Sequence, residues 1–193
     1  MQKSNPKSIF GRKTLSHRLK DDRLPHPPDH QILEIFPALL GRRQGDVPAE
    51  GEIIPLGVAD VKREGTDITV VSWSRQLTVC LEAAEELAAE ELAAEGISVE
   101  VVDPRTLQPL DTATICASVA KTGRLAVVHE AVQFGGFGGE VVAQVVEQAW
   151  GALKQPPLRI GAPFCPVPYS EPMERFVLPQ KSRIVERLRG YLG

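Results

Sequence analysis

The sequence predicts an α/β domain with three layers: an open, mostly parallel sheet with helices on both faces. Two observations lead to this class. Short runs of β-branched residues, typical of buried strands, alternate with longer segments of helical periodicity. The loops between them are short, and alternating elements joined in this way form a parallel sheet with helices packed on either side.

The chain is expected to divide into three segments. Residues 1–30 form a basic leader without regular structure, because they carry seven Lys or Arg against three Asp and four prolines interrupt them. Residues 31–52 form a linker, and residues 53–193 form the folded domain. The leader has a composition that overlaps with mitochondrial transit peptides, but a solvated basic tail or a junction left by a different gene arrangement explains it equally well.

The folded domain is expected to begin with a strand and a long helix. Residues 68–73 read Ile-Thr-Val-Val-Ser-Trp, a β-branched run that suits a buried strand. A helix over 76–95 follows and ends at Gly96, a residue type that readily adopts the left-handed conformation after a helix. The repeat of Ala-Ala-Glu-Glu-Leu over 83–92 lengthens this helix, and we interpret it as a tolerated duplication.

A second strand and helix follow. Residues 97–102 form an apolar strand that Asp103-Pro104 ends. A helix over 112–121 comes next, with Asp111 as a good N-cap and Gly123 to close it.

The third strand covers residues 125–129 and leads into a glycine-rich turn at 135–139. The turn opens a helix that extends to about residue 153. The apolar positions of this helix form a wide stripe, so we expect it to be largely buried.

The C-terminal part is expected to add a fourth strand over 158–161 and a final helix from about residue 182. Residues 156–179 hold seven prolines. Proline fixes the backbone φ angle and removes a hydrogen-bond donor, so this stretch is predicted to be an extended, stiff strap. A strap of this kind can cover its own domain or a partner subunit.

Two features near the end of the third strand are candidates for chemistry. His129 and Glu130 stand at the edge where open α/β sheets bind ligands, and a histidine there could transfer protons. No Ser, Cys or second carboxylate forms a recognisable motif with them, so a hydrogen-bonded structural histidine is the competing interpretation. Gly135, Gly136 and Gly138 could let backbone N–H groups approach an anion, but their spacing equally indicates a tight turn packed on the sheet.

The composition disfavours several classes of function. The net charge of -3 argues against a nucleic-acid partner, and the longest apolar runs are too short to span a membrane. The three cysteines are widely spaced without a CxxC pair, so neither a disulfide framework nor a zinc site is expected. The cluster of His17, His26, Asp29 and His30 follows no metal-ligand spacing, and we expect no metal site.

A set of motifs, in order along residues 53–192, resembles one known family. The motifs are Ile54-Pro55-Leu56-Gly57, 63–71, 100–111, Lys121-Thr122-Gly123-Arg124, Val128-His129-Glu130-Ala131, Gly135-Gly136-Phe137-Gly138, Pro166-Val167-Pro168-Tyr169 and Leu178-Pro179. They are similar to the C-terminal, transketolase C-terminal-like domain of the beta subunit of thiamine-diphosphate-dependent 2-oxo acid dehydrogenases, of the pyruvate and branched-chain types.

The resemblance implies a role in assembly. In that family a preceding pyrimidine-binding domain supplies the carboxylate that activates the cofactor, and residues 31–52 resemble only the end of it. The alpha subunit supplies the diphosphate and magnesium site. The chain alone is therefore expected to bind neither thiamine diphosphate nor magnesium and to be inactive, whereas the complete complex would decarboxylate a 2-oxo acid oxidatively and pass the acyl group to lipoyl.

The implied partners are the alpha subunit, a second beta subunit and the dihydrolipoyl acyltransferase core. The implied location is cytoplasmic in a bacterium and the mitochondrial matrix in a eukaryote. We expect no catalytic residue in this chain. Two alternatives stay open: a stand-alone, non-catalytic binding or scaffold module, and a small anion or nucleotide binder at the glycine turn. The candidates for the subunit boundary are His129, Glu130, Phe137, Tyr169 and Phe176.

Overall fold

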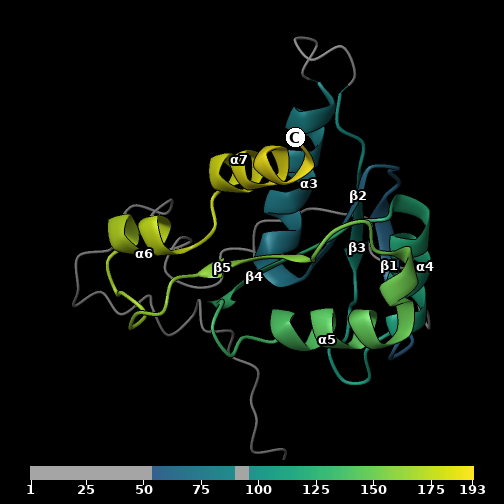
Figure 1. Ribbon diagram of the computed structural model, residues 1–193. Coiled ribbons are helices and arrows are strands. Elements are labelled where there is room, and N and C mark those ends of the chain that lie inside the picture. Colours follow the sequence, from purple (N-terminus) through teal and green to yellow (C-terminus); the bar gives the residue numbers. More distant parts are fainter. Residues whose placement is uncertain (1–53, 90–95) are drawn as a thin grey trace, which may run out of the picture. The chain divides into compact units, whose positions relative to one another are not determined.

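The computed structural model describes residues 54–89 and 96–193, so the expectations for the leader and the linker lie outside the described residues. The elements carry the labels of Figure 1. In chain order they are β1 (Asp60–Arg63), β2 (Ile68–Ser72), α3 (Ser74–Ala88), β3 (Val99–Asp103), α4 (Thr112–Thr122), β4 (Leu125–Val132), α5 (Gly138–Ala149), the 3₁₀-helix η1 (Trp150–Ala152), β5 (Leu158–Ala162), α6 (Glu171–Val177) and α7 (Lys181–Leu192).

The sheet has five strands in the order β1-β3-β2-β4-β5. The four strands that the sequence predicts, β2 to β5, pair in parallel, whereas β1 pairs with β3 in the antiparallel direction. All five residues of β2 are buried, as expected for a central strand covered on both faces. The prediction of an open, mostly parallel sheet is confirmed.

Two separate cores hold the helices on the two faces of the sheet. Successive side chains of a strand point to opposite faces, so Ile68 and Val70 pack against α3 and α7, whereas Val71 packs with α4 and α5. Figure 1 shows α7 and α5 on opposite sides of β4 and β5. The molecule therefore has the predicted three layers.

A buried polar network joins α4 to the sheet. The hydroxyl of Thr69 lies 2.7 Å from that of Ser118 and 2.8 Å from that of Thr122. The Glu100 carboxylate, 1% exposed, accepts hydrogen bonds from Ser118 and from the Gly65 backbone N–H, and it forms an ion pair with Lys121. A buried carboxylate is tolerated where several donors compensate for its lost hydration, and this site meets that condition.

The predicted end of the first helix is wrong. Helix α3 ends at Ala88 instead of residue 95, and Gly96 does not have the positive φ of a left-handed cap. Leu87, 1% exposed, belongs to the last buried turn of the helix, and its carbonyl accepts a hydrogen bond from Ile97, which begins the return to the sheet. The helix ends where its buried stripe ends. Most of the second copy of the repeat, residues 90–92, lies outside the described residues.

Three further differences concern elements with weak or misleading patterns. Strand β1 is not predicted from the sequence, because three of its four residues are charged and it lacks the apolar run of a buried strand. It is short and lies at the edge of the sheet. Helix α6 replaces part of the predicted extended strap: Pro172 lies in its first turn, where the missing proline N–H costs nothing. Helix α5 is less buried than expected, since only Gly138, Val141 and Val145 are fully covered and Trp150, in η1, is 66% exposed.

Candidate functional site at the carboxyl edge of the sheet

His129 lies in the second half of β4, on the face that α5 covers, and is 1% exposed. Its imidazole ring stacks on Trp73, with ring centroids 5.6 Å apart and an angle of 12° between the planes. Trp73 directly follows β2, the neighbour of β4 in the sheet. Phe137 meets the same indole edge-on at 6.1 Å. Two adjacent parallel strands therefore bring these rings together at their carboxyl ends.

The glycine turn packs against the other side of this histidine. A Cβ atom on Gly136 would clash with the carbonyl oxygen of Val132 and lie 2.7 Å from the Cε1 atom of His129, and one on Gly138 would clash with the ring at Nε2. Gly135 has a φ of 70°, which favours glycine for a separate reason. The His129 ring explains the glycine at 138, and the Val132 carbonyl together with that ring explains the one at 136, which agrees with the packing interpretation of the turn.

Burial lowers the pKa of His129 below its ordinary value of 6.5; the backbone of Ala131 opposes this shift and the positive charge of Arg159 adds to it. The ring is therefore neutral at pH 7. Apart from a poorly aligned contact with the backbone of Ala131, neither ring nitrogen has a hydrogen-bond partner among the described residues. Burial leaves the ring without access to a substrate in solvent.

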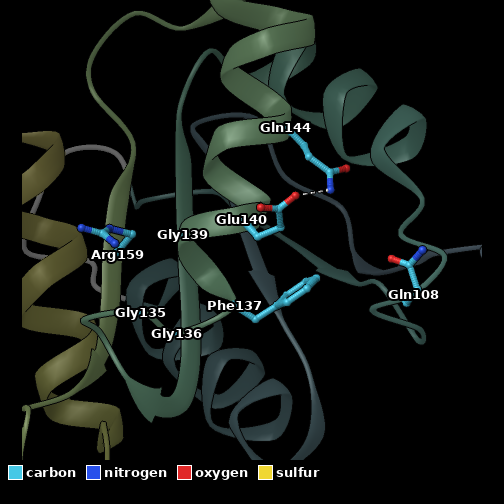
Figure 2. Close-up of a pocket in the computed structure, with 8 residues that line it drawn as sticks. All are labelled: Gln108, Gly135, Gly136, Phe137, Gly139, Glu140, Gln144 and Arg159. Atoms are coloured by element: carbon cyan, nitrogen blue, oxygen red, sulfur yellow. Dashed lines mark hydrogen bonds between the residues drawn. The ribbon is translucent and has the colours of Figure 1, made fainter.

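A cavity of about 740 Å³ opens beside the N-terminus of α5. Figure 2 shows Arg159 and Gln108 on opposite sides of the first turn of this helix, with Glu140 directed toward Gln144, whose Nε2 atom donates a 2.8 Å hydrogen bond to it. The cavity thus offers one cationic and one anionic side chain. The remaining residues that line it are Gly135, Gly136, Phe137 and Gly139.

The residues present do not fit thiamine diphosphate with magnesium. The described part of the chain contains no group of three or more His, Cys, Asp or Glu side chains that could hold a metal ion. Gly138 packs on the imidazole ring of His129 and does not line the cavity, and Glu140 is the one carboxylate among the described residues that line it. We therefore derive no chemical step through this cofactor.

An exposed apolar surface lies beyond the carboxyl ends of β4 and β5. We call it the aromatic surface; its large side chains are 60% to 99% exposed, far more than is usual for residues of this type. Figure 1 shows α6, which carries two of them, past the ends of β4 and β5. Large exposed apolar patches mark sites of association with other proteins. The aromatic surface consists of Phe134, Phe164, Val167, Tyr169, Met173 and Phe176.

The five candidate boundary residues fall into different environments. Tyr169 and Phe176 belong to the aromatic surface, at 99% and 84% exposure. Phe137 and Glu130 are half-buried; burial and the nearby charge of Glu174 raise the pKa of Glu130, and Arg75 opposes them. His129 is buried behind the glycine turn, so it supports this region from inside the domain.

Two residues of the region are absent from the sequence-based candidates. Trp73 supplies the face on which His129 stacks, and Arg159 lines the cavity. Trp73 ends a predicted strand, but the order of the strands in the sheet is needed to place it beside His129. Arg159 was simply the second residue of a predicted strand, with no motif around it.

The cysteines and the helices carry no further sign of chemistry. All three cysteines are free. Burial raises the pKa of Cys80 to about 12, so its thiol stays protonated, while Cys116 and Cys165 are half-buried. Among the described residues, the helices are all too short or too polar to cross a bilayer.

Comparison with known proteins identifies the family to which this domain belongs. Residues 57–184 match the family described as transketolase, C-terminal domain. The chain is 44% identical over 147 residues to the pyruvate dehydrogenase E1 component subunit beta of Bacillus subtilis, which covers 76% of this chain and 43% of that subunit. It is 43% identical over 149 residues to the 2-oxoisovalerate dehydrogenase subunit beta 2, mitochondrial, of Arabidopsis thaliana, covering 75% and 38%.

A solved structure agrees with these relatives. A split gene transketolase, described as an inactive beta4 tetramer, has a TM-score of 0.60 and 25% sequence identity, and the match covers 77% of this chain and 45% of that one. The chain thus spans less than half the length of the curated relatives that it matches. The chain belongs to the transketolase C-terminal domain family, and its curated relatives include beta subunits of pyruvate and branched-chain 2-oxo acid dehydrogenases and of an acetoin oxidoreductase.

Proposed function

We propose that the chain is the C-terminal assembly domain of a 2-oxo acid dehydrogenase beta subunit. It would act in a complex that oxidatively decarboxylates a 2-oxo acid and transfers the acyl group to lipoyl. The aromatic surface is the observation that carries the proposal: large apolar side chains at one end of a well-packed domain are what a subunit presents to its partners. The names of the relatives favour pyruvate or 2-oxoisovalerate as the substrate.

The chain's contribution to this function is structural. His129 is buried and neutral, with no nucleophile or second titratable group hydrogen-bonded to it among the described residues. Thiamine diphosphate and magnesium would be held by other parts of the complex. The domain by itself is therefore expected to have no decarboxylase activity.

The proposed partners are the alpha subunit, a second beta subunit and the dihydrolipoyl acyltransferase core. The similar transketolase described as a beta4 tetramer supports contacts between beta chains. Tyr169, Phe176 and Phe137 are the proposed contact residues, with Glu130 at the margin and His129 supporting the turn from within. The complex would lie in the cytoplasm of a bacterium or in the mitochondrial matrix of a eukaryote.

Co-expression with the alpha subunit from the same genome tests the proposal. A tagged alpha subunit should retain the wild-type chain on an affinity column, and the double variant Tyr169→Glu/Phe176→Glu should be lost, because charges cannot be buried in an apolar interface. Trp150→Glu is the matched control, since Trp150 is 66% exposed but lies in η1, outside the aromatic surface. Equal retention of all three chains, or retention of none, would contradict the proposal.

A stand-alone binding or scaffold module is the second candidate. It is favoured by one observation: the described domain has a complete pair of cores, although the chain spans less than half the length of its relatives. A folded chain that binds no alpha subunit under any condition of the co-expression test would favour this candidate.

A further inference from the structure

A second, smaller cavity lies inside the aromatic surface. It has a volume of about 290 Å³ and opens between the end of β4, the end of β5 and α7. Small-molecule pockets begin at about 300 Å³ and enclose most of their ligand. This cavity is at the lower limit of that range, so it suits one or two side chains of a docked protein better than a free metabolite.

The cavity is lined by two cations and no anion. Arg159 and Arg183 both line it, and no Asp or Glu does. Among the described residues neither arginine is within salt-bridge distance of a carboxylate; Arg159 makes one long contact, 3.4 Å, to the backbone oxygen of Gln133. A guanidinium has five N–H donors, so most of the donor capacity at this cavity is not used by the described residues and is open to water or to a group from another molecule.

The charge of the surroundings reinforces this local imbalance. Residues 54–193 carry 13 basic and 18 acidic side chains, so the domain as a whole is acidic. Helix α7, which supplies Arg183, has the opposite sign, with four basic residues and one acidic residue. A positive area on an otherwise negative domain attracts an acidic partner. The negative faces of the domain repel the same partner, so it is directed to the positive area.

Aromatic rings border the two arginines. Phe134 and Phe164 meet edge to face with centroids 5.6 Å apart, and they are 76% and 80% exposed. Exposed phenylalanine next to arginine is the composition found at the energetic centres of protein interfaces. The partner group must therefore combine a carboxylate with an apolar side chain.

We propose that this cavity is a docking site for an acidic segment of a partner protein, in which an apolar side chain flanked by Asp or Glu enters the cavity and packs against the paired rings of Phe134 and Phe164. The flanking carboxylates pair with Arg159 and Arg183. Because the cavity is part of the aromatic surface, this inference rests on the proposed assembly function and names the chemistry of one contact within it.

Fluorescence anisotropy with the full chain tests the docking site. The probe is a fluorescein-labelled peptide in which one Phe is flanked by two acidic residues on each side. We expect saturable binding that weakens about tenfold or more in Arg159→Gln/Arg183→Gln, because two charge-assisted contacts are lost. Arg187→Gln, on the same helix but not lining the cavity, should bind the peptide like the wild type.

Matched peptides separate the two parts of the proposal. Replacing the Phe by Ala, or the acids by their amides, should each abolish most of the binding. Three results would overturn the proposal: the Ala peptide binds as tightly as the Phe peptide, Arg187→Gln loses as much affinity as Arg159→Gln/Arg183→Gln, or the double variant loses none. The third result is expected if the basic residues 1–30 bind the peptide instead of the cavity. If the double variant does not fold, Phe164→Ser replaces it, since this ring is 80% exposed.

One outcome assigns the cavity to a different occupant. If the chain self-associates and Phe164→Ser releases monomers, a second copy fills the cavity and the acidic segment is excluded. Failure of the peptide to bind leaves retention by the alpha subunit unaffected, so the two proposals fail separately.

Discussion

The Glu100→Gln substitution is the most informative test of how the fold is stabilised. The carboxylate accepts hydrogen bonds from the Ser118 hydroxyl and the Gly65 N–H, and it pairs with the Lys121 ammonium. All three groups act as donors toward it. A glutamine keeps the size of the side chain but removes its charge and turns one acceptor oxygen into a donor, so the charge-assisted contacts to Lys121 and Gly65 weaken and the Ser118 hydroxyl must turn round to accept instead of donate.

The magnitude follows from the burial of each contact. A hydrogen bond to a charged group contributes about 1.5–3 kcal/mol, and the contribution of Lys121 is small because its side chain is 43% exposed. We expect Glu100→Gln to lower the free energy of unfolding by about 2–3 kcal/mol, which corresponds to a decrease in Tm of about 4–12 °C. Urea denaturation followed by circular dichroism measures it.

Glu64→Gln is the matched control. Glu64 also pairs with Lys121, but its side chain is 77% exposed. Removing its charge should change the stability by less than about 0.5 kcal/mol. Equal effects of the two substitutions, or a loss below about 0.5 kcal/mol for Glu100→Gln, would refute the view that burial makes this network important.

The same network predicts an acid dependence of stability. Burial acts to raise the pKa of Glu100, but hydrogen bonds from Lys121, Ser118 and Gly65 outweigh it and hold the pKa below its ordinary value of 4.5. This carboxylate therefore stabilises the fold fully above about pH 4.5, and the stabilisation is lost as the pH falls through the folded-state pKa. Between pH 7 and pH 3, the wild type should lose more stability than Glu100→Gln.

Two further predictions concern the ring of His129. Gly138→Ala should destabilise the fold by about 1–3 kcal/mol, because the new methyl group meets the imidazole. Gly151→Ala is the control: open space surrounds this residue, so the stability should change by less than about 1 kcal/mol. Equal shifts in the Tm of the two variants would contradict this explanation. Because the pKa of His129 is lowered in the fold, its protonation favours unfolding, and the wild type should lose stability as the pH falls below about 6.5. His129→Phe keeps a ring on Trp73 but cannot be protonated. Its free energy of unfolding should therefore fall less than that of the wild type between pH 7 and pH 5. If the free energies of both proteins fall in parallel, His129 does not cause the pH dependence.

The sequence predicts the parallel strands β2, β3 and β4 well, because each contains a β-branched run that helices cover on both faces; β5, at the edge of the sheet, follows only from its short apolar segment. Helix α4 follows from its caps Asp111 and Gly123, whereas α5 and α7, which have no side-chain cap, follow from apolar periodicity. The order of the strands does not follow from local pattern. Trp73 and His129 are each recognisable at the end of a predicted strand, but their stacking depends on β2 and β4 being neighbours, which only the assembled sheet determines.

The errors have local physical causes. The seven prolines between residues 156 and 179 suggested an extended strap, yet proline is compatible with the first turn of a helix, where Pro172 lies. The helical pattern continued past Ala88, but the sheet requires the chain to turn back there, and the contact of Ile97 with the carbonyl of Leu87 replaces further helical hydrogen bonds. Tertiary packing overrides local preference in both places.

The proposal that this domain functions as part of a larger assembly is tested most directly by native mass spectrometry. The chain would be co-expressed with the alpha subunit of a 2-oxo acid dehydrogenase from the same genome and sprayed from the purified mixture. The account predicts a complex whose mass includes at least one 21.0 kDa chain together with the alpha subunit. A spectrum that contains only the folded 21.0 kDa chain and a separate alpha subunit would contradict it.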